Sequence, residues 1–313
     1  MLGISRVLTR RLFQAVLVAL LVATLCFCLA RVLPGDMAYQ IGAGRYGADL
    51  TTQESVEAVR AELGLDRSPV LAWLSWIGDL ARLDLGRSYI HGTPVWRLIG
   101  DQLSATLALS AAALAVSCFL GPPLGLLAGL RPGGVLDRTS LGASVLLRAM
   151  PPFVVGVLLV IVFAIGLKWL PAAGHTQAGS IVLPALTLGL GLAAVSSRVA
   201  RSAMVDVANA DYFQFALTKG LPVWRVALAH GVRNVGVPIV THLGMQLVFL
   251  VEGVLVVETL FAWPGIGHAL THAVVDRDVP MIQGAALTMA MLFVLFNALV
   301  DLAALAIDPR LRK

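Results

Sequence analysis

The sequence predicts an all-α integral membrane protein, and two observations support that prediction. The 313 residues are 58% hydrophobic and only 13% charged, whereas soluble domains carry about 25% charged residues. The apolar stretches are also long and continuous, which is typical of membrane helices, because the strands of a membrane barrel would alternate apolar and polar residues. A helix satisfies its backbone hydrogen bonds within one segment, as the interior of a bilayer requires.

Six stretches are apolar and long enough to cross a bilayer as helices. A helix rises 1.5 Å per residue and needs about 20 residues to cross roughly 30 Å of hydrocarbon. We expect spans at about 12–33, 103–130, 140–167, 181–200, 236–260 and 281–306. The first span follows a basic N-terminus and so resembles a signal peptide, but it is too long for a signal core and lacks a small-residue cleavage site, so we expect it to be retained.

The distribution of basic residues predicts which loops face the cytoplasm. With the N-terminus inside, almost all basic residues near the spans are cytoplasmic, and the short outside segments hold only Lys168 and Arg277. Both termini are then cytoplasmic, and residues 34–102 form one outside region. The net charge of +5 follows this topology and forms no basic stripe, so we expect no nucleic-acid partner. No internal repeat is visible, and we expect one transmembrane domain over residues 1–313.

The outside region contains two amphipathic stretches. In "TTQESVEAVRAELG", Thr51 and Glu54 fit a capping box and Gly64 can end the helix, with Val56, Val59 and Leu63 on one face. In "VLAWLSWIGDLARL", the two tryptophans suit a membrane interface, although packing against the outside ends of the spans would produce the same pattern.

Residues 211–238, "DYFQFALTKGLPVWRVALAHGVRNVGVP", form a polar segment between the fourth and fifth spans. The pattern indicates helix, turn and helix: an amphipathic stretch is stopped by Gly220, and Leu221-Pro222 restarts the chain. A short helix in such a loop offers a plug for a groove on a cytoplasmic partner. The alternative is a solvated basic loop, which explains the charges but not why a glycine and a proline follow the amphipathic stretch.

This segment, extended to "THLG", resembles the conserved cytoplasmic loop (the EAA loop) of ATP-binding-cassette importer permeases. More narrowly, it is similar to the first permease subunit of the dipeptide, oligopeptide and nickel importer group. Further stretches resemble landmarks of that group in order: "RVLPGD" (31–36), "AELGLDRSP" (61–69), "LDLGRS" (83–88), "AMPPFVVGVLL" (149–159), "VETLFAWPGIG" (257–267) and "DPRLR" (308–312). The resemblance implies a type I importer permease core of six transmembrane helices, an extracytoplasmic region between the first two, and a cytoplasmic coupling loop at 198–234.

The resemblance also implies how this loop acts. Its helix docks into a groove on an ATPase subunit; Asp211 and Tyr212 open it, Ala216 is the small contact position and Gly220 forms the turn. The implied coupling residues are Asp211, Tyr212, Phe215, Ala216, Lys219, Gly220, Leu221 and Arg225. Relatives often carry a basic residue after the aspartate-tyrosine pair, where this chain has Phe213, Gln214 and Phe215, so the contact here is expected to be more apolar.

The implied assembly places this chain in the bacterial inner membrane, surrounded by lipid. Its partners would be a second, homologous permease, two cytoplasmic ATPase subunits and an extracytoplasmic binding protein, which delivers substrate to a face formed by residues 34–102 and 261–280. The sequence contains no G-x-x-x-x-G-K-[ST] motif. We therefore expect this chain to bind no cofactor, with ATP and magnesium held by the ATPase subunits, and to have no catalytic residues.

Polar residues within apolar spans are functional candidates by default, because burying them in a bilayer is costly. The candidates for a translocation path or gate are His242, Glu252, Glu258, Trp263, Pro264, Gly265, Asn297 and Asp301. Simpler alternatives remain open: Asn297 and Asp301 could bond a neighbouring helix, His242 could pack between helices, and the "FAWPGIG" turn could be an interfacial loop with a tryptophan anchor.

Two further patterns predict structure more than chemistry. Gly121, Gly125 and Gly129 recur every four residues and allow close helix packing, and Pro151-Pro152 predicts a bend in the third span. His268 and His272 share a helix face, but two histidines make an incomplete metal site, and we expect none.

Three classes of function compete at this stage. The leading prediction is an importer permease for di- and oligopeptides, and the same importer class could instead carry nickel or a metal chelate. An ion-gradient-driven transporter would show paired broken helices and inverted repeats, which are not visible. A membrane enzyme would need a motif such as H-E-x-x-H or G-x-S-x-G, and the sequence has neither.

Overall fold

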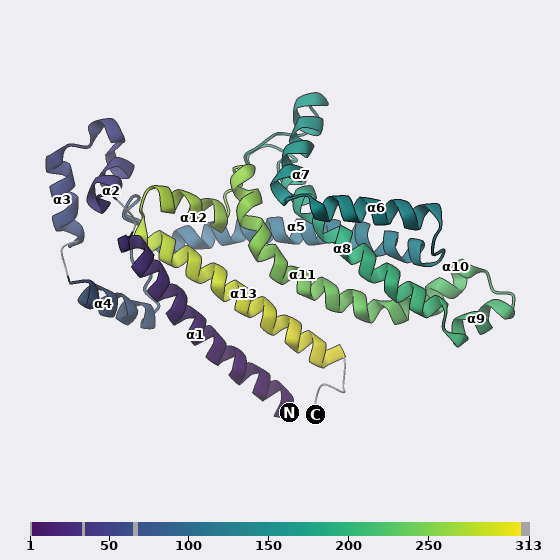
Figure 1. Ribbon diagram of the computed structural model, residues 1–313. Helices are drawn as coiled ribbons and strands as arrows, with labels where there is room; N and C mark the ends of the chain where they lie inside the picture. Colours follow the sequence, from purple (N-terminus) through teal and green to yellow (C-terminus); the bar gives the residue numbers. More distant parts are fainter. Residues whose placement is uncertain (1, 33–34, 65–67, 308–313) are drawn as a thin grey trace. The chain divides into compact units, whose positions relative to one another are not determined.

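The computed structural model describes residues 2–32, 35–64 and 68–307, and over these ranges the regular elements are helices (Figure 1). The elements are α1 (Leu2–Val32), α2 (Met37–Tyr46), η1 (Ala48–Leu50), α3 (Gln53–Leu63), α4 (Pro69–Ala81), α5 (Val95–Gly129), α6 (Val135–Ala149), α7 (Pro152–Leu159), η2 (Val160–Gly166), α8 (Val182–Ala208), α9 (Asp211–Thr218), α10 (Val223–Val226), η3 (Ala227–Gly231), α11 (Val232–Leu260), α12 (Ile266–Val275) and α13 (Val279–Ile307). The prediction of an all-α membrane protein is confirmed.

Five helical stretches in the described ranges are long and apolar enough to cross a membrane, and a bent pair supplies a sixth candidate. The five are Leu8–Val32, Val95–Gly129, Val182–Ala208, Asn234–Val251 and Val279–Leu302. The bent pair, Val135–Ala149 and Pro152–Gly166, turns by 107°. The predicted bend is confirmed, but it is sharper than a kink. Met150 and Pro151 are extended, with ψ of 132° and 145°. Each precedes a proline, and a proline disfavours the helical conformation of the residue before it.

The chain forms two compact units. Among the described residues, the first is built on Leu107–Trp263 and takes in residues 2–8 and 295–307; the second holds Thr9–Thr106 and Pro264–Val294. The expectation of one transmembrane domain over residues 1–313 stays a prediction.

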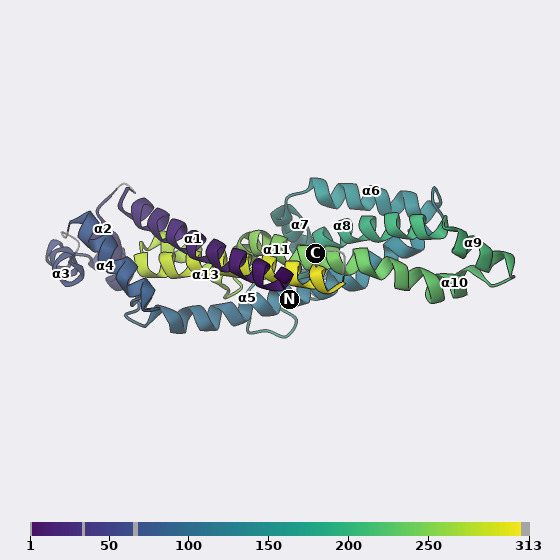
Figure 2. The ribbon, with the colours of Figure 1, turned by 90° about the horizontal axis from the view of Figure 1, so that it is seen from below.

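In the first unit, α8 is the central helix. It packs against α6, α7 and α11, and α6 runs alongside it in both views (Figures 1 and 2). The glycine stripe of α5 also lies against α8. A Cβ on Gly121 would lie 1.9 Å from the Ser196 hydroxyl oxygen, and a Cβ on Gly129 would lie 2.7 Å from the Cβ of Met204. The predicted close packing is confirmed, and its partner is α8.

An ion pair fastens α6 to α8 near one end of the first unit. Arg201 donates from Nε and Nη2 to the two oxygens of Asp137, at 2.9 and 2.8 Å, and the Gly133 amide donates to the same carboxylate at 2.8 Å. A two-point guanidinium contact fixes orientation as well as distance. The broken third span therefore keeps its first half aligned with α8.

In the second unit, α1 runs alongside α13 (Figure 1), and Ala19 of α1 packs against a core that includes Leu85, Ile99, Ile266 and Met281. A separate small core joins α2 and α3. Its buried members are Ala38, Ile41 and Val59, with Val56 and Leu63 packed against them. The predicted apolar face of α3 is thus confirmed.

The two ends of α3 test the predicted caps. Gly64 ends the helix in the left-handed conformation, with φ 57° and ψ 42°, as expected of a C-terminal glycine. The N-terminal prediction was wrong by one residue, because Thr52 caps the helix and accepts from the Ser55 amide at 3.3 Å. Thr51 instead donates its hydroxyl to the Gly47 carbonyl at 2.8 Å. Two adjacent threonines offer the same chemistry, and the preceding turn decides between them.

The tryptophan-bearing helix α4 has no buried residue, and Leu71 and Leu74 are more than half exposed. Trp73 donates from Nε1 to the Thr24 hydroxyl of α1 at 3.3 Å. Exposed leucines beside a tryptophan tied to a spanning helix suit the boundary between lipid and water. The packing interpretation of this stretch is confirmed for Trp73, and the interfacial interpretation stays a prediction.

Candidate functional site

The segment between α8 and α11 folds as the predicted helix, turn and helix, and we call residues 211–226 the coupling hairpin. Gly220 has φ +81°, a conformation that side chains with a Cβ rarely adopt, and its amide donates to the Leu217 carbonyl at 2.9 Å. Pro222, with φ −68°, then caps α10. The hairpin lies beyond the end of α8 in both views (Figures 1 and 2).

The inner face of the coupling hairpin is apolar and buried. Phe213 and Ala216 of α9 and Val226 of α10 form one cluster with Met204 of α8 and Val235 of α11. Leu221 of the turn packs against the same cluster. Ala216, which the resemblance implied as a contact for a partner, is 7% exposed, so its small side chain serves the packing inside this chain.

The outer face of the coupling hairpin is aromatic and basic. Phe215 and Trp224 are both 61% exposed and Tyr212 is 44% exposed. The Lys219 ammonium lies 4.5 Å from the centroid of the Phe215 ring, and the Arg225 guanidinium lies 5.9 Å from that of Trp224. These cation–π contacts orient both charges over the exposed rings. Asp211 at the start of α9 is exposed as well.

The contact was expected to be more apolar because of Phe213 and Phe215, and the structure gives these two phenylalanines different environments. Phe213 is 2% exposed and belongs to the core, whereas Phe215 faces outward. Sequence reasoning missed Trp224. Its position directly after Leu221-Pro222-Val223, at the start of the second helix, was the available signal.

The predicted gate residues begin at the end of α11. Glu258 is fully buried, and its carbonyl accepts from the Trp263 amide at 2.9 Å. Ala262 adopts a left-handed φ of +47°, so the helix ends there as the "FAWPGIG" pattern predicts. Trp263 is itself 8% exposed and is therefore a packed residue rather than a freely exposed anchor. The boundary between the two units falls directly after it.

Pro264 and Gly265 lead from this turn into α12, which belongs to the second unit. The first amide of α12, on Ile266, donates to the Thr106 hydroxyl of α5 at 2.9 Å. A side-chain acceptor at a helix start satisfies a donor that the helix itself leaves unpaired. The bond fixes where α12 starts relative to α5.

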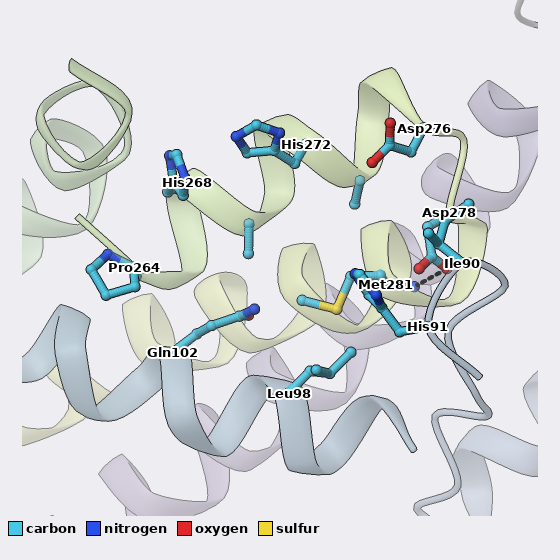
Figure 3. A pocket seen from close by; sticks show the side chains of 13 residues that line it. Ile90, His91, Leu98, Gln102, Pro264, His268, His272, Asp276, Asp278 and Met281 are labelled. Atoms are coloured by element: carbon cyan, nitrogen blue, oxygen red, sulfur yellow. Dashed lines mark hydrogen bonds between the residues drawn. The ribbon is translucent and has the colours of Figure 1, made fainter. Parts of the chain in front are cut away.

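Pro264, Gly265, α12 and the first turns of α5 line an open cavity of about 200 Å³, together with Ile90, His91 and Met281 (Figure 3). His268 and His272 lie on the α12 side and Gln102 on the α5 side. The two imidazoles meet edge to face with centroids 4.5 Å apart. Burial, and then the neighbouring His272, lower the pKa of His268. Over the part of the chain that the structure describes, no three potential metal ligands gather here or elsewhere.

The outer face was expected to form from residues 34–102 and 261–280, and the same unit joins the first of these segments to residues 264–280. The Asp278 carboxylate, 2% exposed, accepts from the Ser88 hydroxyl and from the Tyr89 amide at 3.0 Å. Burial, and then the Asp278 charge, raise the pKa of Tyr89. Neither Ser88 nor Asp278 stood out in the sequence, because each looks like an ordinary loop residue.

The first unit holds a larger cavity, of about 490 Å³, which we call the inner cavity. It lies where α6 and α7 break apart, with α8 and α11 as its other walls. Its lining residues include Leu147, Arg148, Met150, Pro152, Val155, Leu192, His242, Gln246, Phe249 and Leu250. The candidate His242 therefore faces a cavity, as the sequence allowed.

The remaining path candidates do not gather around His242. Glu258 does not line the inner cavity, nor do Asn297 and Asp301, which are half-buried on α13. The side chains of Glu252 and Arg233 and the stretch 308–312 lie outside the described part of the structure. Sequence reasoning also missed Gln246, which is 1% exposed; a glutamine within an apolar span was the available signal.

Comparisons with known proteins agree with this architecture. Residues 121–313 match the family described as binding-protein-dependent transport system inner membrane component, and residues 4–110 match the N-terminal family of the same membrane components. A probable peptide ABC transporter permease of Sinorhizobium fredii is 35% identical over 311 residues, covering 97% of this chain and 98% of the relative.

Other relatives match over nearly their whole length. A putative peptide transport system permease of Brucella abortus is 34% identical over 316 residues, covering 98% of this chain and 99% of the relative. A glutathione transport system permease of Pectobacterium atrosepticum is 36% identical over 303 residues, covering 97% of each chain. The chain therefore belongs to the family of inner membrane components of binding-protein-dependent transport systems.

Proposed function

We propose that this chain is one permease subunit of an ATP-driven importer that carries di- and oligopeptides. The peptide assignment is supported by relatives that match over nearly their full length and are named for peptides or for glutathione, itself a small peptide. The observation that carries the coupling role is the two-faced hairpin at residues 211–226, with one face in the core and one exposed.

The outer face of the coupling hairpin docks into a groove on an ATPase subunit. Exposed aromatic rings supply contact area at low entropic cost, and interfaces are enriched in such anchors. Phe215 and Trp224 are the anchors, with Lys219 and Arg225 held over their rings. Asp211 and Tyr212 border this contact, and Gly220 with Leu221 fixes the turn that presents it.

The inner face passes the motion of the ATPase to the membrane helices. Phe213 and Ala216 are packed with Met204 of α8 and Val235 of α11, so a pull on the hairpin displaces both helices together. Packed cores switch between discrete arrangements and do not deform continuously. Closure of the ATPases on ATP would thereby turn an inward-open path into an outward-open one.

The remaining subunits follow from the same proposal. The N-terminus and the coupling hairpin face the cytoplasm, and a binding protein delivers peptide to the face formed by residues 34–102 and 261–280. A second, homologous permease completes the path, and two ATPase subunits hold ATP and magnesium. His242, Glu252, Asn297 and Asp301 belong to the path, while Glu258 and the turn at Trp263, Pro264 and Gly265 form the outer gate.

Uptake by a strain that lacks only this gene tests the cargo. We expect the strain to lose accumulation of a labelled dipeptide, and the restored gene to recover it, while uptake of labelled nickel, with or without a chelator, stays unchanged. Loss of nickel uptake with intact dipeptide uptake would overturn the peptide assignment and favour a metal or metal-chelate importer.

A further inference from the structure

A buried polar chain crosses the apolar interior of the first unit, from α8 through α5 to α11. Its members are Ser117, Ser196 and Gln246, each at most 1% exposed. The Ser117 hydroxyl lies 2.9 Å from Oε1 of Gln246 and 3.3 Å from the Ser196 hydroxyl. Buried polar groups persist only where they are hydrogen-bonded, and within a membrane span they mark function by default.

The hydrogen bonds of Gln246 fix which way its amide points. Its Nε2 lies 2.8 Å from the Leu192 carbonyl oxygen, which can only accept a hydrogen bond, so the NH₂ group must face Leu192. Oε1 then accepts from Ser117, and the opposite orientation would set two acceptor oxygens against each other.

This orientation determines the tautomer of His242. The second N–H of the Gln246 amide points at Nε2 of His242, 3.3 Å away. Since the amide nitrogen can only donate, Nε2 must accept, and a neutral imidazole with an accepting Nε2 carries its proton on Nδ1. His242 lines the inner cavity, so the one N–H donor that its ring offers to the cavity is at Nδ1.

The chemistry of the inner cavity suits a ligand with a carboxylate and an apolar body. Arg148 also lines it and adds a positive charge. Its described walls are otherwise mostly aliphatic or aromatic, from Leu147, Val155, Leu188, Phe249 and Leu250, and among the described lining residues none is a carboxylate.

We propose that the inner cavity receives the C-terminal carboxylate of the transported peptide, with His242 as donor through Nδ1 and Gln246 as the residue that positions it. This inference rests on the proposed function, since it names the end of the peptide that the permease recognises. Arg148 attracts the carboxylate, and the aliphatic walls hold the adjacent side chain. Without Gln246, the imidazole proton is free to move to Nε2, and the cavity loses its oriented donor.

The test uses the complete importer in proteoliposomes with saturating binding protein. It compares ATP-dependent uptake of one dipeptide as the free acid and as its C-terminal amide. We expect wild type to favour the free acid, and His242→Phe to lower that preference by about tenfold or more, because the variant loses a hydrogen bond to a charged group. Gln246→Met should lower it in the same direction by a smaller factor. His175→Phe, which removes an exposed histidine outside the cavity, should leave it unchanged.

A second measurement reads the tautomer directly. Solid-state NMR of ¹⁵N-histidine-labelled importer, with His242 assigned by its loss in His242→Phe, should show the proton on Nδ1, and Ser117→Ala should weaken that preference. A proton on Nε2 in wild type would overturn the proposal. This measurement needs no Gln246→Met protein, so it remains decisive if that variant fails to assemble.

The outcomes separate this inference from the proposed function. If wild type accumulates dipeptide and His242→Phe retains its free-acid preference, the carboxylate site is wrong and the peptide importer stands. If wild type accumulates neither form of any dipeptide tested, the proposed function fails, and the carboxylate site fails with it.

Discussion

Ser88 and Asp278 lie 190 residues apart in the sequence and form a buried hydrogen bond. It joins the loop before α5 to the start of α13, and the Tyr89 amide donates to the same carboxylate. Asp278→Ala should leave these donors without their acceptor, at a cost of about 1–3 kcal/mol each. We expect faster hydrogen exchange at residues 83–94, measured by mass spectrometry. Asp49→Ala, an exposed change in the same unit, is the control, and unchanged exchange in Asp278→Ala would contradict the assigned role.

The α5–α8 contact depends on the absence of a side chain at Gly125. A Cβ there would lie 2.1 Å from the Ser197 carbonyl oxygen and 2.9 Å from the Arg201 amide nitrogen. Backbone atoms cannot yield as a flexible side chain can, so Gly125→Ala should exceed the usual overpacking cost of about 1–3 kcal/mol. Thermal unfolding in detergent should show a clear fall in Tm. Gly100→Ala on the same helix meets open space and should not lower Tm.

The two faces of the coupling hairpin should respond differently to truncation. Phe213→Ala removes a fully packed ring and should cost about 3–5 kcal/mol of stability, seen as less folded protein. Phe215→Ala removes an exposed ring and should leave Tm unchanged, while lowering the ATPase activity that the loaded binding protein stimulates in the complete importer. Normal stimulated ATPase activity in Phe215→Ala would remove Phe215 from the docking surface.

Gly220 tests the turn without touching either face. A Cβ there would meet no neighbour, but φ is +81°, so only conformational strain is at issue. A β-branched residue is a genuine outlier at positive φ, whereas asparagine tolerates it better. Gly220→Val should abolish uptake while the protein stays in the membrane, and Gly220→Asn should retain most of it. Equal uptake by both variants would contradict the role of the turn.

Much of the fold could be predicted from local patterns. Gly220 with Leu221-Pro222 marked the hairpin, and Gly64 marked the end of α3, because each signal acts on its own backbone. The four-residue spacing of Gly121, Gly125 and Gly129 predicted close packing. The spacing did not identify α8 as the partner. Small residues on one helix show that a neighbour can approach closely, but not which helix that neighbour is.

The candidate site was harder to predict, because its residues act across elements. The sequence could not separate Phe213 from Phe215, since the side that faces the core depends on Met204 and Val235 of other helices. Gln246 was visible as a glutamine in an apolar span, but its contacts with α5 and α8 were not. His242 was visible as a polar residue in an apolar span, but its tautomer follows only from its neighbours.

The most direct test of the central claim is ATP-dependent accumulation of a labelled dipeptide in proteoliposomes that contain the complete importer. Parallel samples should contain wild-type permease, Phe215→Ala and Gly220→Val. We expect wild type to accumulate dipeptide only with both ATP and binding protein present, and both variants to lose accumulation. Accumulation without ATP, or undiminished accumulation in both variants, would contradict an importer driven through residues 211–226.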